Sequence, residues 1–234
     1  MKANRIMQSK IYRILDYVLR LVLLNALIVI PSFSLFIIFS NVFKNGNNQL
    51  LSLLLIPMLL WLIPSIVATT DVIRQYENNE TNTIFKDFFK SLKKHYLKSL
   101  IISIFVYIGI GLLVNSLVYF FNNVAKGGLY FAGLLLTISF SLAFILIVIQ
   151  FPLVTTYFKD LGVFEIIKLS CIFAFKNIMV NLLILVFIVG FIIVDILYYF
   201  VTALIGFSVP IYLTVKLLFK QYIKIYRKVE RNEN

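Results

Sequence analysis

Runs of apolar residues, each about as long as a membrane-crossing helix, occupy most of this sequence. A helix needs about 20 mostly apolar residues to cross the ~30 Å hydrocarbon core of a bilayer. Because lipid cannot satisfy free backbone groups, such runs predict α-helices. We therefore predict an all-α polytopic bundle of about six transmembrane helices, forming a single membrane-embedded domain over residues 1–234, with spans at 21–43, 50–70, 99–121, 129–151, 178–199 and 201–219.

Composition agrees with a membrane protein rather than a soluble one. Hydrophobic residues make up 61% of the chain and charged residues only 14%, against about 45–50% and about 25% in soluble domains. A soluble domain of this size has too much surface to hide that apolar area. The boundary between the last two runs is weak, because almost no polar residue separates them. Residues 178–219 therefore form either two spans, one long broken helix or a re-entrant hairpin.

The positive charges are segregated along the chain. All but two of the 22 cations lie in the N-terminal tail, between the second and third runs, between the fourth and fifth, or near the C-terminus; the exceptions are Lys44 and Lys126. Cytoplasmic loops carry such an excess, so we expect both termini in the cytoplasm. The same partition explains the net charge of +12 without a nucleic-acid partner. The Ile, Lys and Asn bias is typical of an AT-rich bacterial genome, which predicts a multi-pass protein of the bacterial cell (inner) membrane.

The stretch Ile84–Lys98 has an amphipathic helical pattern. Its apolar residues Ile84, Phe85, Phe88, Phe89, Leu92 and Tyr96 share one face, and its lysines lie opposite. Such a helix lies in the membrane interface or packs on the ends of the spans. We predict contact with anionic lipid headgroups or a partner through Lys86, Lys90, Lys93, Lys94, Lys220 and Lys224. His95 is expected to face solvent or headgroups.

Four polar residues inside the predicted spans are candidate site residues. Asp195 is the only acid well within a span, and intramembrane carboxylates suggest a functional role. It lies near the outer end of its span, which favours an interfacial role over contact with a solute or proton. Asn25, Asn115 and Gln150 are amides of the kind that hold helices together, with ligand contact as the alternative.

Motifs of catalysis or cofactor binding are missing from the sequence. One cysteine, Cys171, and one histidine, His95, provide no thiolate cluster or histidine metal centre. The sequence contains no phosphate-binding loop, nucleophile elbow or zinc-protease motif. We therefore predict no catalytic residues, no metal, no cofactor and no enzymatic activity.

A faint internal repeat is visible. Residues 64–70 (PSIVATT) resemble 152–156 (PLVTT), and 94–102 resemble 176–184. Each unit reads as span, cytoplasmic helix, span. Transporters contain repeats of this kind, with the substrate site at the repeat interface.

Three segments carry a resemblance to a known family: 11–25 (IYRILDYVLRLVLLN), 63–70 (IPSIVATT) and 85–94 (FKDFFKSLKK). They resemble the YesL family of bacterial integral membrane proteins, which are built on a domain of unknown function. The family often has tryptophan where this chain has Tyr17, and Pro-Ala where it has Pro64-Ser65. The resemblance implies a link to carbohydrate uptake, with an ABC-type carbohydrate permease as a possible partner. The resemblance implies no particular binding or catalytic residues in this chain.

These observations predict a non-enzymatic accessory to solute uptake, with carbohydrate as the expected solute class. The stretch 160–176 does not match the ATPase-docking loop of permease subunits, so the chain is not expected to be one. The alternative is an autonomous secondary transporter or channel with a site at the repeat interface. A transporter is expected to have a polar cavity near the midplane lined by Asn25, Asn115 or Gln150, whereas an accessory is expected to have a closed apolar bundle and an exposed partner surface.

Overall fold

The structure is a computed structural model that describes residues 10–42, 51–78, 83–198 and 204–232, without the side chains of 10–13, 33–42, 51–59, 195–196, 219–221 and 224–232. The described part is all α-helical, as predicted. It contains seven α-helices and one short 3-10 helix: α2 (Lys10–Val42), α3 (Leu51–Glu77), α4 (Ile84–Asn123), η2 (Val124–Lys126), α5 (Gly128–Tyr157), α6 (Val163–Lys176), α7 (Ile178–Leu197) and α9 (Ser208–Asn232).

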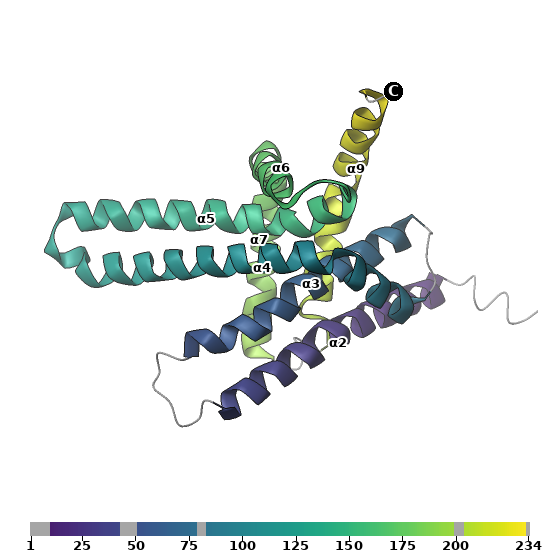
Figure 1. Cartoon of the computed structure of the whole chain (residues 1–234), viewed down its shortest axis with the longest axis horizontal. Coiled ribbons are helices and arrows are strands. Elements are labelled where there is room, and N and C mark those ends of the chain that lie inside the picture. The colour runs from purple at the N-terminus through teal and green to yellow at the C-terminus, as the bar shows by residue number, and fades with distance from the viewer. Residues whose placement is uncertain (1–9, 43–50, 79–82, 199–203, 233–234) are drawn as a thin grey trace, which may run out of the picture.

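Helices α4 and α5 form a long antiparallel hairpin that projects away from the other helices (Figure 1). The turn between them requires glycine at one position, because Gly127 has φ 148°. Close approach of the two helices uses two further glycines. A Cβ at Gly109 would overlap the ring of Phe144, and one at Gly133 would overlap the ring of Phe120.

The prediction of six spans is corrected by the structure. Three described helices are long and apolar enough to cross a membrane: Ile14–Ser32 within α2, Ile84–Lys126 and Gly128–Tyr157. Val163–Lys176 and Ile178–Val194 are bent by 93° relative to each other and count as a fourth only if they form one broken span. Among the described residues of the expected sixth span 201–219, the apolar helix is the short segment Ser208–Leu218. In α3, the part with described side chains (60–77) contains three charged residues, Asp71, Arg74 and Glu77, and is not among the candidate spans.

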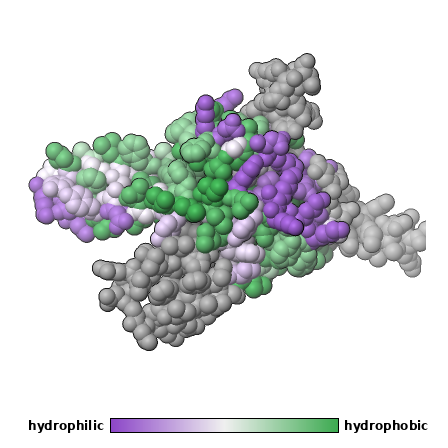
Figure 2. Space-filling view, in the orientation of Figure 1, coloured by the Kyte–Doolittle hydropathy of each residue, from purple (hydrophilic) through white to green (hydrophobic). Residues whose placement is uncertain are grey.

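Several long apolar helices nevertheless indicate a multi-pass membrane protein. The α4–α5 hairpin exposes large apolar side chains along its length, including Leu112, Phe121, Leu136 and Phe140. Soluble monomers rarely expose so much contiguous apolar surface, and such a surface matches contact with lipid. In the space-filling view, hydrophilic residues gather at the turn of this hairpin and over the start of α4, and apolar residues occupy much of the surface between them (Figure 2).

The amphipathic stretch Ile84–Lys98 continues directly into the third predicted span as the 40-residue helix α4. At 1.5 Å per residue this helix is about 60 Å long, twice the hydrocarbon thickness, so part of it must lie outside the membrane. Its buried stripe is Phe88, Ser91, Leu92, His95, Ser99, Ile102, Ser103 and Val106.

The orientation of α4 differs from the predicted one. Phe85 and Phe89 are half exposed, although both were placed on the packing face, and His95 is only 2% exposed. The expectation that His95 faces solvent or headgroups was therefore wrong. The physical reason is that residues i, i+3, i+4 and i+7 share a helix face, so packing through Phe88, Ser91 and Leu92 also buries His95.

Candidate functional site

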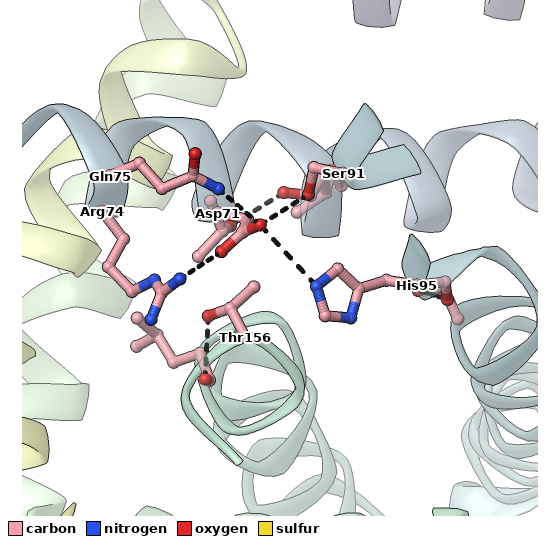
Figure 3. Close-up of polar contacts among 10 residues, drawn as sticks. Asp71, Arg74, Gln75, Ser91, His95 and Thr156 are labelled. Carbon is pink, nitrogen blue, oxygen red and sulfur yellow. Dashed lines mark hydrogen bonds and ion pairs between the residues drawn. The ribbon is translucent and has the colours of Figure 1, made fainter. Parts of the chain in front are cut away.

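A buried carboxylate, that of Asp71, is the centre of the most extensive charged cluster in the described residues. Asp71 lies on α3 just beyond the predicted span 50–70 and is 2% exposed. Its Oδ1 accepts a hydrogen bond from Arg74 Nη2 at 2.7 Å, and its Oδ2 accepts one from Gln75 Nε2 at 2.8 Å. Ser91 Oγ on α4 also donates to Oδ2, at 2.9 Å. These side chains converge on the carboxylate from two helices (Figure 3).

His95 approaches the same carboxylate from one turn further along α4. Its Nε2 lies 3.7 Å from Asp71 Oδ2, which is too long for a hydrogen bond, so the contact is electrostatic and attractive when the imidazole is protonated. Burial of Asp71 opposes its ionisation, but the contact with His95, the charge of Arg74 and the hydrogen bond from Ser91 outweigh it and hold its pKa below the usual value. Asp71 is therefore ionised, and both of its carboxylate oxygens accept hydrogen bonds.

Arg74 connects this cluster to α5. Its guanidinium carbon lies 5.3 Å from the ring centroid of Tyr157, within the range of a cation–π interaction. Thr155 and Thr156, just before Tyr157, are fully buried, and Thr156 lies beneath the cluster (Figure 3). We call Asp71, Arg74, Gln75, Ser91 and His95, with Tyr157, the Asp71 cluster. It joins the last turns of α3, the first turns of α4 and the end of α5.

The lysines near the Asp71 cluster have different environments. Lys98 Nζ donates to the backbone oxygens of Lys159 at 2.6 Å and Leu161 at 2.8 Å, and so satisfies carbonyls that follow α5. Partial burial and the nearby charge of Arg74 lower the pKa of Lys159. The predicted headgroup or partner residues Lys86, Lys90, Lys93 and Lys94 are all exposed on α4. The side chains of Lys220 and Lys224 lie outside the described residues.

A second polar cluster surrounds Gln150, one of the predicted candidates. Gln150, Asn181 and Tyr222 are each fully buried, on α5, α7 and α9. Gln150 Nε2 donates to Asn181 Oδ1 at 2.5 Å, and Tyr222 Oη donates to Gln150 Oε1 at 2.6 Å. Asn181 Nδ2 in turn donates to the oxygens of Ala174 at 2.9 Å and Phe173 at 3.3 Å. The cluster therefore holds the bend between α6 and α7 against two other helices.

The remaining candidates lie apart from both clusters. Asn25 on α2 is fully buried, and its Oδ1 accepts hydrogen bonds from the backbone N–H of Phe207 at 2.9 Å and Ser208 at 3.2 Å. Asn25 thereby satisfies backbone N–H groups at the start of α9, which have no hydrogen-bond partner within the helix itself. Asn115 is exposed and donates to the Gly111 oxygen of its own helix at 2.8 Å. The side chain of Asp195 lies outside the described residues.

A cavity of about 410 Å³ lies among α3, α4, α5, α7 and the start of α9. Asn25, Asn115 and Gln150 do not line it, and among the residues with described side chains the polar ones that line it are Thr70 and Thr214. Both hydroxyls donate within their own helices, to the oxygens of Ile66 and Pro210 at 2.8 Å. The described lining is therefore almost entirely apolar, and both of its hydroxyl protons are already used in hydrogen bonds.

The segment that contains most of the Asp71 cluster is the one that a known family shares. Residues 21–117 match the family model described as "Protein of unknown function, DUF624". This DUF624 segment includes Asn25, Asp71, Arg74, Ser91 and His95, and it ends before Gln150. The expected domain of unknown function is thus confirmed for under half of the chain, and the YesL name stays a prediction. Comparison with curated proteins and with solved structures found no match.

The Asp71 cluster was not among the predicted sites, although part of its signal is visible in the sequence. Arg74 and Gln75 follow Asp71 at i+3 and i+4, the spacing at which helix neighbours meet. Asp71 also follows directly on the Thr69-Thr70 pair of the internal repeat. What the sequence could not indicate is the partnership with Ser91 and His95, because it depends on how α3 packs on α4.

Proposed function

We propose that this chain is a non-enzymatic membrane protein that assists solute uptake by a partner and contacts that partner through the exposed start of α4. One observation carries the proposal: the large cavity is apolar, and the buried amides Asn25 and Gln150 join helices instead of lining it. Transport of a polar solute requires hydrogen-bonding groups along its path. An apolar bundle with its amides engaged favours an accessory role.

The Asp71 cluster supports a structural role over a catalytic one. A general base must reach the proton that it removes, and Asp71 is 2% exposed with donors on both oxygens. A buried carboxylate surrounded by Arg74, Ser91 and His95 is suited to joining helices α3 and α4. It offers no free oxygen to a substrate.

The start of α4 has the composition of a contact surface. Four exposed lysines alternate there with Phe85, Phe89 and Leu97, which are 54%, 51% and 76% exposed. Aromatic side chains are enriched in protein interfaces, and the lysines suit an acidic partner or anionic headgroups. Carbohydrate as the solute and an ABC-type permease as the partner rest on the resemblance to the YesL family. The location of this surface in the cytoplasm rests on the distribution of cations.

The test is purification in mild detergent from the native membrane, combined with growth of a deletion strain on a panel of carbohydrates. We expect a transporter subunit to co-purify and growth to slow on one or a few sugars but not on glucose. Lys90→Glu combined with Lys93→Glu reverses charge on the proposed surface. This double variant is expected to lose the co-purifying transporter subunit and to grow as slowly as the deletion strain on the same sugars. Lys168→Glu, an exposed lysine on α6, is the matched control and should behave like the parent.

Two results would contradict this proposal. Parental growth of the deletion strain, with no transporter subunit co-purifying, would remove the accessory role. Solute movement by the purified protein alone in liposomes would establish the autonomous transporter instead, and Asp195→Asn would then test the one acid predicted well within a span.

A further inference from the structure

The apolar cavity borders α4 and α5, two helices that are long and apolar enough to cross a membrane, so it is expected at membrane depth. Its lining includes Val106 and Ile110 on α4, Val148 on α5 and Ile192 on α7. At about 30 Å³ for a group the size of water, its 410 Å³ has room for on the order of a dozen methylene groups. This volume also lies within the range of ligand pockets, about 300–1,000 Å³.

Water is a poor occupant for such a site. Apolar cavities stay dry, since water needs two or more polar partners, and the hydroxyls of Thr70 and Thr214 already donate to backbone oxygens. An empty void of this size is also unfavourable, because its lining loses dispersion contacts. Within a bilayer the apolar material at hand is the lipid acyl chain.

Charges beyond one end of the cavity indicate which lipid. Lys159 follows the cavity-lining Leu153 by six residues, whereas Arg74, one turn beyond the cavity-lining Thr70, is already paired with Asp71. On α4, Lys94 precedes Val106 by 12 residues, about 18 Å along the helix. One leaflet contributes about 15 Å of hydrocarbon, so a headgroup level with these cations places its chain at the depth of the cavity.

We propose that the cavity holds an acyl chain of an anionic phospholipid from the leaflet on the basic side of the protein. The chain fills the space between α5 and α9, and the phosphate-bearing headgroup lies near Lys94 and Lys159. The bound lipid then completes the packing of five helices that protein side chains leave incomplete.

The experiment uses the full-length protein in liposomes that contain phosphatidylglycerol with a photoactivatable group near the end of one acyl chain. We expect crosslinks at Val148, Pro210 and Val215 inside the cavity as well as at Ile138, which is half exposed on the lipid-facing side of α5. The same probe on phosphatidylcholine should label the cavity about tenfold less and Ile138 equally. Unlabelled phosphatidylglycerol should compete only at the cavity.

Val148→Trp fills the cavity and is expected to remove its labelling while leaving that of Ile138. Leu142→Trp, on the same helix but outside the cavity lining, is the matched control and should keep both. Cavity labelling no stronger than background in the unaltered protein, or unchanged in Val148→Trp, would overturn the proposal. Equal labelling by the two headgroups would overturn the choice of an anionic lipid. The competition arm needs no variant, so the proposal stays testable if Val148→Trp does not fold.

Discussion

Asp71 is the residue on which contacts between α3 and α4 converge. It receives hydrogen bonds from Arg74, Gln75 and Ser91, and His95 lies within 3.7 Å. Arg74 is also nearly buried, with a side chain 11% exposed. A buried ion pair adds little net stability when compared with apolar packing, but removing one member leaves the other charge uncompensated. The cluster is therefore expected to be sensitive to single substitutions.

We expect Asp71→Asn to destabilise the protein by about 3–5 kcal/mol, because Arg74 loses its counter-charge in a buried site. Thermal unfolding of the detergent-purified protein measures the effect. Asp16→Asn is the control, since it breaks the more exposed Arg20–Asp16 pair, of 2.8 Å at i and i+4, worth about 0.3–0.5 kcal/mol. Equal effects of the two substitutions would show that the Asp71 cluster does not hold the helices together.

Among the helices, the α4–α5 hairpin depends on close contact at glycine. The two glycines of the Gly109-Ile-Gly111 stretch differ in their surroundings. A side chain at Gly109 meets the ring of Phe144, whereas nothing lies within 4 Å of the position of a Cβ at Gly111. The bend between α6 and α7 is a second helix-level feature, and Asn181 stabilises it by donating to the last carbonyls of α6.

Gly109→Ala is expected to destabilise the protein by about 1–3 kcal/mol, as overpacking does, because the Phe144 ring must move. Gly111→Ala should be neutral or stabilising by up to about 1 kcal/mol, since alanine favours the helix. Thermal unfolding of both variants in detergent provides the comparison. A loss of stability in Gly111→Ala as large as in Gly109→Ala would contradict the proposed contact.

At the scale of the whole molecule, α4 runs from a basic region at its own start to the turn of the α4–α5 hairpin. Four exposed lysines lie near its start, and Asn123 lies at its last residue. Because its middle is apolar and long enough to cross a bilayer, these two ends should lie on opposite sides of the membrane. The distribution of cations predicts that the basic end lies in the cytoplasm.

In a Cys171→Ser background we expect Asn123→Cys to react with a membrane-impermeant thiol reagent in intact cells, and Lys93→Cys to react only after permeabilisation. Asn232→Cys should behave like Lys93→Cys if the C-terminus is cytoplasmic. Labelling of Lys93→Cys in intact cells would reverse the orientation. Labelling of Asn232→Cys in intact cells would require an even number of crossings after α4.

The sequence by itself determined the helical class, the multi-pass membrane character and the ends of several helices. These properties depend on the length of the apolar runs and on local composition, and both are visible in the sequence itself. Tertiary structure decided the rest. The burial of His95 follows from the rotation of α4 about its own axis, which its neighbours set. The joining of Gln150 to Asn181 and Tyr222, and of Asn25 to α9, depends on the packing of helices distant in sequence. The span count changed because, among the described residues, only α2, α4 and α5 contain an apolar stretch long enough to cross a bilayer unbroken. Helix α7 forms a 93° bend with α6, and the apolar part of α9 is short.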